Sequence, residues 1–390
     1  MTRRKVLVVC MFDSIHAGRW LSQFTDQEID FILFPSKKFR KIHPKLVGLL
    51  KNKDGASFKI AHLSKMPSIL GYLDFLFIIQ VSRILQRNIR VSYLRRILKA
   101  NEFDFVHALE IQGAGYLCDE AIQTKKFRFI LTNWGSDIFY FQHLADHLPK
   151  IKSVLAKADL YSAECQRDYK LALEFGFTGD QLPCIPNGGG LIENELSGNG
   201  VLPSSRNNIV VKTYGGTFGR GGLAIEAVAK VMMENRELTA YFYSVTDDLL
   251  SKVMEIKTVF NTRVSYSTPK NPISHKELEE IFLRSRIYIG CSISDGISTS
   301  FLEALANGVY PIQTSSSCAG EWVKKGAMAS LIELDYEELL AELSAAVKDD
   351  KLVDTASEAN KALVQKSLEF SIIKNIALQF YSFPQKTLQT

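Results

Sequence analysis

Short apolar runs rich in Val, Ile and Phe recur along the chain and alternate with segments of helical periodicity. They are residues 5–10, 30–34, 104–108, 128–132 and 160–163, then 209–214, 240–244, 286–291, 310–313 and 329–334. Near-continuous apolar strands separated by helices are typical of parallel, doubly wound sheets. The pattern therefore predicts an α/β fold built on parallel sheets.

This alternation stops once, at residues 192–208, which are polar and rich in Gly, Ser, Pro and Asn. Such a stretch predicts a linker, and 390 residues suffice for two domains of about 100–200 residues each. We expect an N-terminal domain at residues 1–191 and a C-terminal domain at residues 209–365. No strand follows the last apolar-periodic segment, so we expect the C-terminal helix, about residues 366–390, to pack back on the first domain.

The net charge of +5 hides an asymmetry between the two halves. Residues 1–100 hold 19 Lys and Arg against six Asp and Glu, whereas residues 201–390 hold 20 against 22. A basic N-terminal domain could meet an anionic membrane or an anionic substrate. Nucleic acid is not an expected partner, because no nucleic-acid-binding module is recognisable in the basic region.

Two basic segments of this domain favour binding to an anionic membrane. One is SKKFRKIHPK at residues 36–45; the other, residues 69–100, places apolar and basic positions at helical spacing. A core-packed helix with a solvated basic face gives the same pattern. The longest apolar stretch, residues 69–81, falls short of the about 20 residues that span a bilayer. We expect a cytoplasmic protein, with peripheral attachment to the inner face of the cell membrane as the alternative location.

Most of the recognisable chemistry lies in residues 287–313, IYIGCSISDGISTSFLEALANGVYPIQ. The pattern predicts a strand, a small polar loop and a helix that begins at about Ser300. A glycine-containing loop entering a helix offers backbone N–H groups and the positive end of the helix dipole, both suited to a diphosphate. Gly296 and the hydroxyls of Ser298, Thr299 and Ser300 are therefore candidate ligands of a diphosphate.

Glu303 lies one turn into this predicted helix, where its carboxylate could reach the diol of a ribose. Ser300 and Glu303 also match the spacing of a capping box, in which the Glu only satisfies a backbone donor. The sequence leaves both interpretations open.

The run SISDGISTSFLEALANGVYPI, residues 292–312, resembles the signature of the retaining GT-B glycosyltransferases of family 4, which serve bacterial surface-polysaccharide synthesis. That signature has two acidic residues separated by seven positions. Asp295 and Glu303 occupy these positions here, with Asp295 in place of the usual Glu. The resemblance implies two Rossmann-like domains facing a cleft, with the acceptor on the N-terminal side and the donor on the C-terminal side.

Five further segments carry the resemblance, and the first and the last of them hold candidate donor-binding residues. Residues 5–20, KVLVVCMFDSIHAGRW, are similar to the first strand and nucleotide-facing loop of these enzymes, which implies donor-binding roles for His16 and Gly18. Residues 212–222, KTYGGTFGRGG, are similar to the first strand and loop of the donor domain. There Lys212 and Arg220 are candidates to clamp the diphosphate, although a solvated lysine and glycines that only turn the chain would look the same.

The same resemblance implies a reaction. A hexose would pass from a UDP- or GDP-sugar to a glycan or lipid-linked acceptor with retention at the anomeric carbon, by front-face displacement. Asp295 and His107 are the candidate catalytic residues, although an isolated histidine is more often structural. No cofactor is expected and no metal, since the chain has no Asp-x-Asp run. The alternatives are a catalytically silent GT-B scaffold and a sugar epimerase or phosphorylase on the same fold.

Overall fold

In the computed structural model, residues 3–61, 86–191 and 200–384 are described. The apolar stretch at residues 69–81 and the first half of the predicted linker lie outside these ranges. The chain divides into two compact units: residues 1–189 with 374–390, and residues 190–373. The division falls inside helix α16 (Phe370–Leu378).

The first unit contains a seven-stranded parallel sheet with strand order β3-β2-β1-β4-β5-β6-β7. Its strands are β1 (Arg4–Cys10), β2 (Ile29–Pro35), β3 (Ser57–Ile60), β4 (Phe105–Leu109), β5 (Arg128–Thr132), β6 (Leu160–Ser162) and β7 (Asp180–Gln181). Its helices are α1 (Ile15–Ser22), α2 (Pro44–Leu49), α4 (Gln86–Ala100), α5 (Tyr116–Ala121), α6 (Leu148–Lys157) and α7 (Gln166–Glu174). This is the parallel α/β architecture that the strand pattern predicts.

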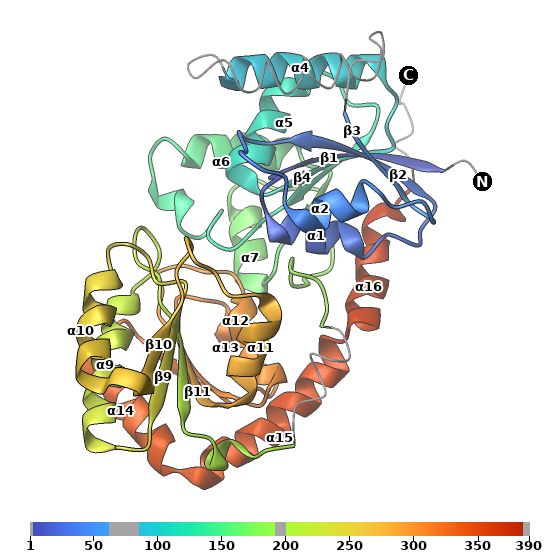
Figure 1. Cartoon of the computed structure of the whole chain (residues 1–390). Helices are drawn as coiled ribbons and strands as arrows, with labels where there is room; N and C mark the ends of the chain where they lie inside the picture. The colour runs from blue at the N-terminus through green and yellow to red at the C-terminus, as the bar shows by residue number, and fades with distance from the viewer. Residues whose placement is uncertain (1–2, 62–85, 192–199, 385–390) are drawn as a thin grey trace. The chain divides into compact units, whose positions relative to one another are not determined.

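The second unit contains a six-stranded parallel sheet with strand order β10-β9-β8-β11-β12-β13. Its strands are β8 (Asn208–Lys212), β9 (Thr239–Tyr243), β10 (Val264–Tyr266), β11 (Ser285–Gly290), β12 (Tyr310–Thr314) and β13 (Ser330–Ile332). Its helices are α9 (Gly221–Glu234), α10 (Leu250–Phe260), α11 (His275–Leu283), α12 (Thr299–Ala306), α13 (Ala319–Lys324), α14 (Tyr336–Lys348) and α15 (Asp350–Ser367). Figure 1 shows α9, α10 and α14 on one face of this sheet and α11 and α12 on the other.

Each sheet has one point where the winding direction reverses. In the first unit β1 pairs with both β2 and β4, and in the second unit β8 pairs with both β9 and β11. Ligands of open α/β sheets bind beside such a switch point, outside the carboxyl ends of the strands. The loops after β1, β4, β8 and β11 are therefore the positions to search for chemistry.

All ten predicted strands are present, and the three other strands within the described residues are sheet edges. β3 and β7 are the two edges of the first sheet, and β10 is an edge of the second. Edge strands bury less surface than central ones. β7 has two exposed residues, and β10 buries one residue of three, so neither produces a long apolar run.

Helix α4 matches one of the two interpretations of residues 69–100. Val91, Leu94 and Ile97 are buried in the core of the first unit, whereas Arg96 and Lys99 on the same helix are exposed. The described part of the predicted interfacial helix is thus a core-packed helix with a solvated basic face, and these apolar side chains are not available to lipid. Within the described ranges, no helix is both long and apolar enough to cross a membrane.

The C-terminal segment belongs to the first unit. The ring of Phe380 packs on Trp20 with centroids 4.7 Å apart, and Tyr381 packs on Phe24 with centroids 5.1 Å apart. The Nζ of Lys374 lies 2.6 Å from a carboxylate oxygen of Asp26. Aromatic packing and this ion pair hold the end of the chain on the first sheet and its helix α1.

Candidate functional site

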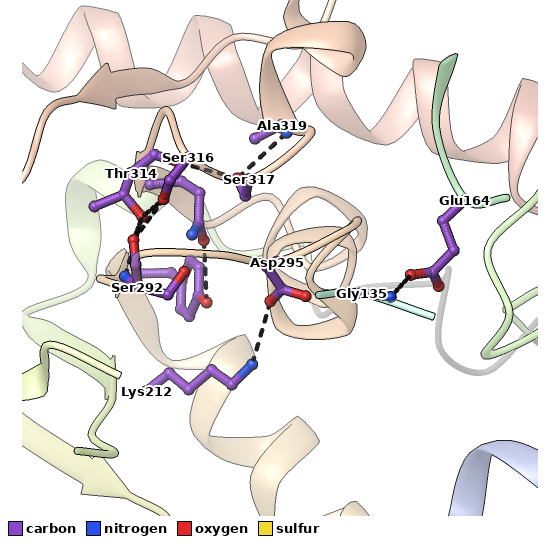
Figure 2. Close-up of polar contacts among 11 residues, drawn as sticks. Gly135, Glu164, Lys212, Ser292, Asp295, Thr314, Ser316, Ser317 and Ala319 are labelled. Atoms are coloured by element: carbon purple, nitrogen blue, oxygen red, sulfur yellow. Dashed lines mark hydrogen bonds and ion pairs between the residues drawn. The ribbon is translucent and has the colours of Figure 1, made fainter. Parts of the chain in front are cut away.

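An ion pair lies beside the switch point of the second unit. Lys212 is the last residue of β8, and Asp295 lies in the loop between β11 and α12. The Nζ of Lys212 points to the Asp295 carboxylate at 3.9 Å (Figure 2). About a quarter of the Lys212 side chain and a fifth of the Asp295 side chain are exposed, so both charges can be reached by a ligand.

Hydrogen bonds hold the loop after β11 to its two neighbours. The backbone N–H of Ile293 donates to the carbonyl of Phe218 at 2.9 Å, which joins it to the loop after β8. On the other side, the hydroxyl of Thr314 donates to the carbonyl of Ser292 at 2.9 Å (Figure 2). The N–H of Cys318 donates to the carbonyl of Gly296 at 2.7 Å. Asp295 is therefore carried by a loop that is fixed from both sides.

The surroundings of Lys212 favour its charged form. Burial acts to lower the pKa of the amine, but Asp295, Tyr214, Tyr288 and Glu303 act to raise it, and the pKa lies above its ordinary value. A lysine in this state is positively charged at neutral pH. Glu303, the second acidic residue of the predicted motif, is therefore within electrostatic range of the ion pair.

The start of α12 excludes one of the two interpretations of Glu303, the capping box. The residue before the helix is Ser298, and Ser300 is already its second helical residue. A capping box requires the Ser at the cap and the Glu at the third helical position, so Ser300 and Glu303 do not form one. The capping box in this region is made by Ser274 and Glu277, at the start of α11.

Glu303 instead faces His275, a residue that the sequence did not single out. The Nε2 of His275 lies 3.2 Å from Oε1 of Glu303. The Glu303 side chain is 13% exposed, and both residues border a small pocket whose apolar lining includes Leu278, Phe282 and Ala306. The sequence signal that could have located His275 is the capping box of Ser274 and Glu277, because it places His275 at the first position of α11.

The other candidates of the loop differ in exposure. The side chains of Ser298 and Ser300 are almost completely buried, whereas Thr299 is half-buried. The first N–H groups of a helix have no partner within the helix. Backbone donors and Thr299 are therefore better placed for an anion in this structure than the two buried hydroxyls.

Arg220 directs its guanidinium to its own loop. It donates to the backbone carbonyl of Gly219 at 2.6 Å and makes longer bonds to those of Gly216 and Thr217. Gly219 has no room for a side chain, because an added Cβ would lie 2.0 Å from the carbonyl oxygen of Tyr214. The predicted diphosphate clamp by Arg220 would require its guanidinium to leave these carbonyls.

His16 and Gly18 belong to the first unit, in helix α1 after β1. The ring of His16 lies edge-on to Trp134, with centroids 5.7 Å apart. Gly18 is buried inside the helix, where an added Cβ would lie 2.9 Å from Cβ of Lys45 in α2. The glycine therefore permits two helices to pack closely. It lies in α1 and not in the expected loop, and its donor-binding role stays a prediction.

His107 does not have the surroundings of a catalytic residue. It is completely buried in β4, and its ring nitrogens are hydrogen-bonded to the hydroxyls of Tyr381 at 2.8 Å and Thr132 at 2.6 Å. Burial lowers its pKa to about 3. Because both nitrogens are occupied inside the core, the geometry favours a packing role for His107 over the predicted catalytic one.

This environment predicts a pH effect on stability. Between pH 6.5 and 3 the unfolded chain binds a proton at His107 and the folded chain does not, so the free energy of unfolding falls as the pH falls, by up to about 1.4 kcal/mol per pH unit from this group. His107→Asn removes that contribution. Urea unfolding at pH 7, 6, 5 and 4 should show a difference between wild type and variant that is largest at pH 7 and shrinks in acid. A constant difference contradicts the assignment.

Comparison with known families adds a finding for each unit. A family model described as "Glycosyl transferase 4-like" matches residues 5–165, and one described as "Glycosyl transferases group 1" matches residues 270–363. The second match includes Asp295, Glu303 and His275. No curated protein matches the sequence.

Solved structures resemble the chain over almost its whole length. HepE of Anabaena, crystallised with UDP-glucose, is 13% identical with a TM-score of 0.69, covering 97% of this chain and 100% of that one. Sucrose-phosphate synthase of Thermosynechococcus elongatus is 14% identical with a TM-score of 0.67, covering 97% of both chains. A putative UDP-N-acetylglucosamine 2-epimerase of Listeria monocytogenes is 12% identical with a TM-score of 0.62, covering 98% of both. Likeness at such identity shows a shared fold.

Proposed function

Since this chain is a glycosyltransferase of the GT-B fold, we propose that its second unit binds a nucleotide sugar of the UDP or GDP type. The sugar passes to a glycan or lipid-linked acceptor with retention, in the synthesis of a surface polysaccharide. The observation that carries this proposal is the pair of Lys212 and Asp295 at the switch point of the second sheet, with Glu303 within electrostatic range. The UDP-glucose complex of HepE supports a donor of this class.

Each of these side chains has a role that its chemistry suits. Lys212 neutralises the charge that develops on the departing diphosphate, together with the N–H groups that begin α12. Glu303 accepts hydrogen bonds from the ribose hydroxyls. When the diphosphate binds Lys212, it replaces Asp295 as the partner of the lysine. The Asp295 carboxylate can then accept hydrogen bonds from the hydroxyls of the donor sugar.

The proposed chemistry is a front-face displacement without a metal. The leaving phosphate oxygen takes the proton of the acceptor hydroxyl while that hydroxyl attacks the same face of the anomeric carbon. The protein contributes orientation of the two substrates and stabilisation of the leaving charge. Lys212 supplies a fixed positive charge at the position where a divalent cation would otherwise be required.

Product analysis distinguishes sugar transfer from epimerisation and from a catalytically silent scaffold. Incubating the enzyme with a donor alone and with donor plus acceptor, followed by mass spectrometry, distinguishes epimerisation from transfer, and NMR of the new linkage gives its anomeric configuration. We expect an acceptor-dependent product with the donor's configuration. An acceptor-independent change of the sugar supports the epimerase, and donor binding without any product supports the silent scaffold.

Glu303→Gln should weaken binding of a nucleoside diphosphate by about 1–3 kcal/mol, because the ribose diol loses a charged acceptor. The melting temperature should change little, since Glu303 does not cap α12. Calorimetric titration together with thermal melting measures both quantities. Glu255→Gln, the same chemical change on the exposed surface of α10, is the matched control. A variant that melts earlier but binds nucleotide normally contradicts the role of Glu303.

The proposal includes a cytoplasmic location and peripheral association with an anionic membrane. Because the described apolar face of α4 is packed into the core, such association would depend on exposed basic residues such as Arg96 and Lys99. Each Lys or Arg near an anionic surface contributes about 1 kcal/mol. Cosedimentation with anionic vesicles should therefore decline steeply between 0.1 M and 1 M salt. Recovery that is independent of salt contradicts this mode of association.

A further inference from the structure

A basic segment of the first unit, residues 38–44, runs from the loop after β2 to the first residue of α2. These residues and Asp13 surround a hollow of about 610 Å³. Lys38, Arg40 and Lys41 line it and are exposed, while the single acidic residue in its lining, Asp13, lies 3.5 Å from Lys37. The hollow therefore has a strong excess of positive charge.

The segment around the hollow is anchored at both ends and in the middle. The backbone N–H of Ser36 donates to the carbonyl of Cys10 at 2.9 Å, and that of His43 donates to the carbonyl of Phe12 at 2.8 Å. Between them, the buried ring of Phe39 packs on Phe12 with centroids 5.2 Å apart. The three cations thus belong to an ordered loop.

The side chain of His43 also lines the hollow, and its ring is oriented by a hydrogen bond. Nδ1 of His43 accepts the backbone N–H of Lys45 at 3.2 Å, which leaves the proton of the neutral ring on Nε2. Burial, Lys45 and Arg19 all lower the pKa of His43, as a positive local potential requires. Two lysines, an arginine and the His43 N–H line the hollow with donors, the chemistry that recognises phosphate oxygens, and the one acidic side chain of the lining, Asp13, is paired with Lys37.

The position of the hollow fits a ligand site. β1 ends at Cys10 and β2 at Pro35, so the loops that form it leave the carboxyl ends of two neighbouring parallel strands, where ligands of such sheets bind. Figure 1 shows α2 beside α1. Its volume exceeds what a single inorganic phosphate fills, leaving room for a diphosphate and the group attached to it.

We propose that this hollow binds the phosphate or diphosphate group of the sugar acceptor. The inference rests on the proposed function, which assigns the donor to the second unit and leaves the acceptor to the first. It specifies the acceptor class: a phosphorylated molecule, either a soluble phosphate ester or a lipid whose head group is a diphosphate. It also gives residues 36–45 a specific ligand, in contrast to a general electrostatic attraction to anionic lipid.

The first experiment is a calorimetric titration of the full chain with pyrophosphate at 0.15 M salt. The nucleoside diphosphate that binds most tightly is present in excess, so that the donor site is filled. Lys38→Gln, Arg40→Gln and Lys41→Gln are combined in one variant; because all three side chains are exposed, the fold should persist. The control combines Lys51→Gln, Lys53→Gln and Lys170→Gln, exposed positions with the same change in net charge.

We expect the hollow variant to lose pyrophosphate affinity by about tenfold or more, because three charge-assisted contacts are removed, and the control to stay within about twofold of wild type. Equal affinity in the hollow variant and wild type overturns the proposal, as does an equal loss in the control. If no nucleotide binds, the proposed donor site fails, yet the pyrophosphate titration still reports on the hollow. The two failures are therefore distinguishable.

A second experiment identifies the source of the phosphate. Zwitterionic vesicles containing a few mole per cent of a prenyl diphosphate lipid lack the general negative charge that would attract other basic residues. Cosedimentation of wild type but not of the hollow variant supports a lipid-linked acceptor. Pyrophosphate binding without cosedimentation supports a soluble phosphate ester. Cosedimentation of both proteins to the same extent contradicts a role for the hollow in lipid binding.

Discussion

Asp295→Ala should reduce the turnover number for sugar transfer by roughly 10²–10³-fold, the range for losing one positioned polar group of an active site. Affinity for the free nucleoside diphosphate should not fall, because that ligand lacks the sugar that Asp295 holds. Loss of the carboxylate also leaves Lys212 without the partner 3.9 Å away, which should strengthen its attraction for phosphate. Steady-state kinetics and calorimetric titration measure the two effects separately.

Asp295→Glu is the matched variant, since it restores the residue that the family 4 pattern usually has at this position. It should retain a substantial part of the activity, because the loop is fixed on both sides and only the carboxylate moves. Wild-type turnover of Asp295→Ala would support the silent scaffold or a different site. A trapped glycosyl adduct on Asp295 would replace the front-face mechanism with a covalent one.

Lys212→Gln should lower kcat/KM by a similar factor of about 10²–10³, because the leaving diphosphate loses its nearest fixed positive charge. Binding should weaken selectively: a nucleoside diphosphate loses affinity, and the nucleoside without phosphates does not. Lys230→Gln, at an exposed position of α9, makes the same change in charge outside the site. Competitive titration of both ligands against wild type and the two variants gives the comparison.

Equal weakening of nucleoside and nucleoside diphosphate by Lys212→Gln would contradict a contact with phosphate and indicate a disturbed fold. Lys212→Arg keeps the charge but enlarges the head group, so it should retain diphosphate binding better than the glutamine variant. A loss as large in Lys212→Arg as in Lys212→Gln would show that the exact shape of the amine matters more than its charge.

The fold could be predicted because its central strands are buried on both faces. Residues 6–10 of β1 are completely buried, and a strand of this kind gives an apolar run visible without knowledge of its neighbours. The edge strands β3, β7 and β10 left no such run. The division inside α16 was not visible either, because a continuous helix has one periodicity whether or not its two ends belong to different units.

The candidate site was predictable only in part, since exposure and direction depend on tertiary packing. The spacing of Asp295 and Glu303 identified the loop, and the structure places Lys212 next to it. Nothing local showed that His107 is enclosed by Thr132 and Tyr381, which are 25 and 274 residues away in sequence. Likewise, the cap of α12 lies at Ser298, two residues before the serine that matched a capping box.

A thermal-shift screen of the full chain with UDP, GDP, CMP and their sugars tests the central claim most directly. A ligand at 100 times its dissociation constant stabilises the folded protein by about 2.7 kcal/mol. We predict that at least one nucleoside diphosphate raises the melting temperature of the wild type. The same ligand should have a much smaller effect on a variant that combines Lys212→Gln with Glu303→Gln. An equal rise in both proteins, or no rise with any nucleotide, would contradict a nucleotide-sugar site formed by these residues.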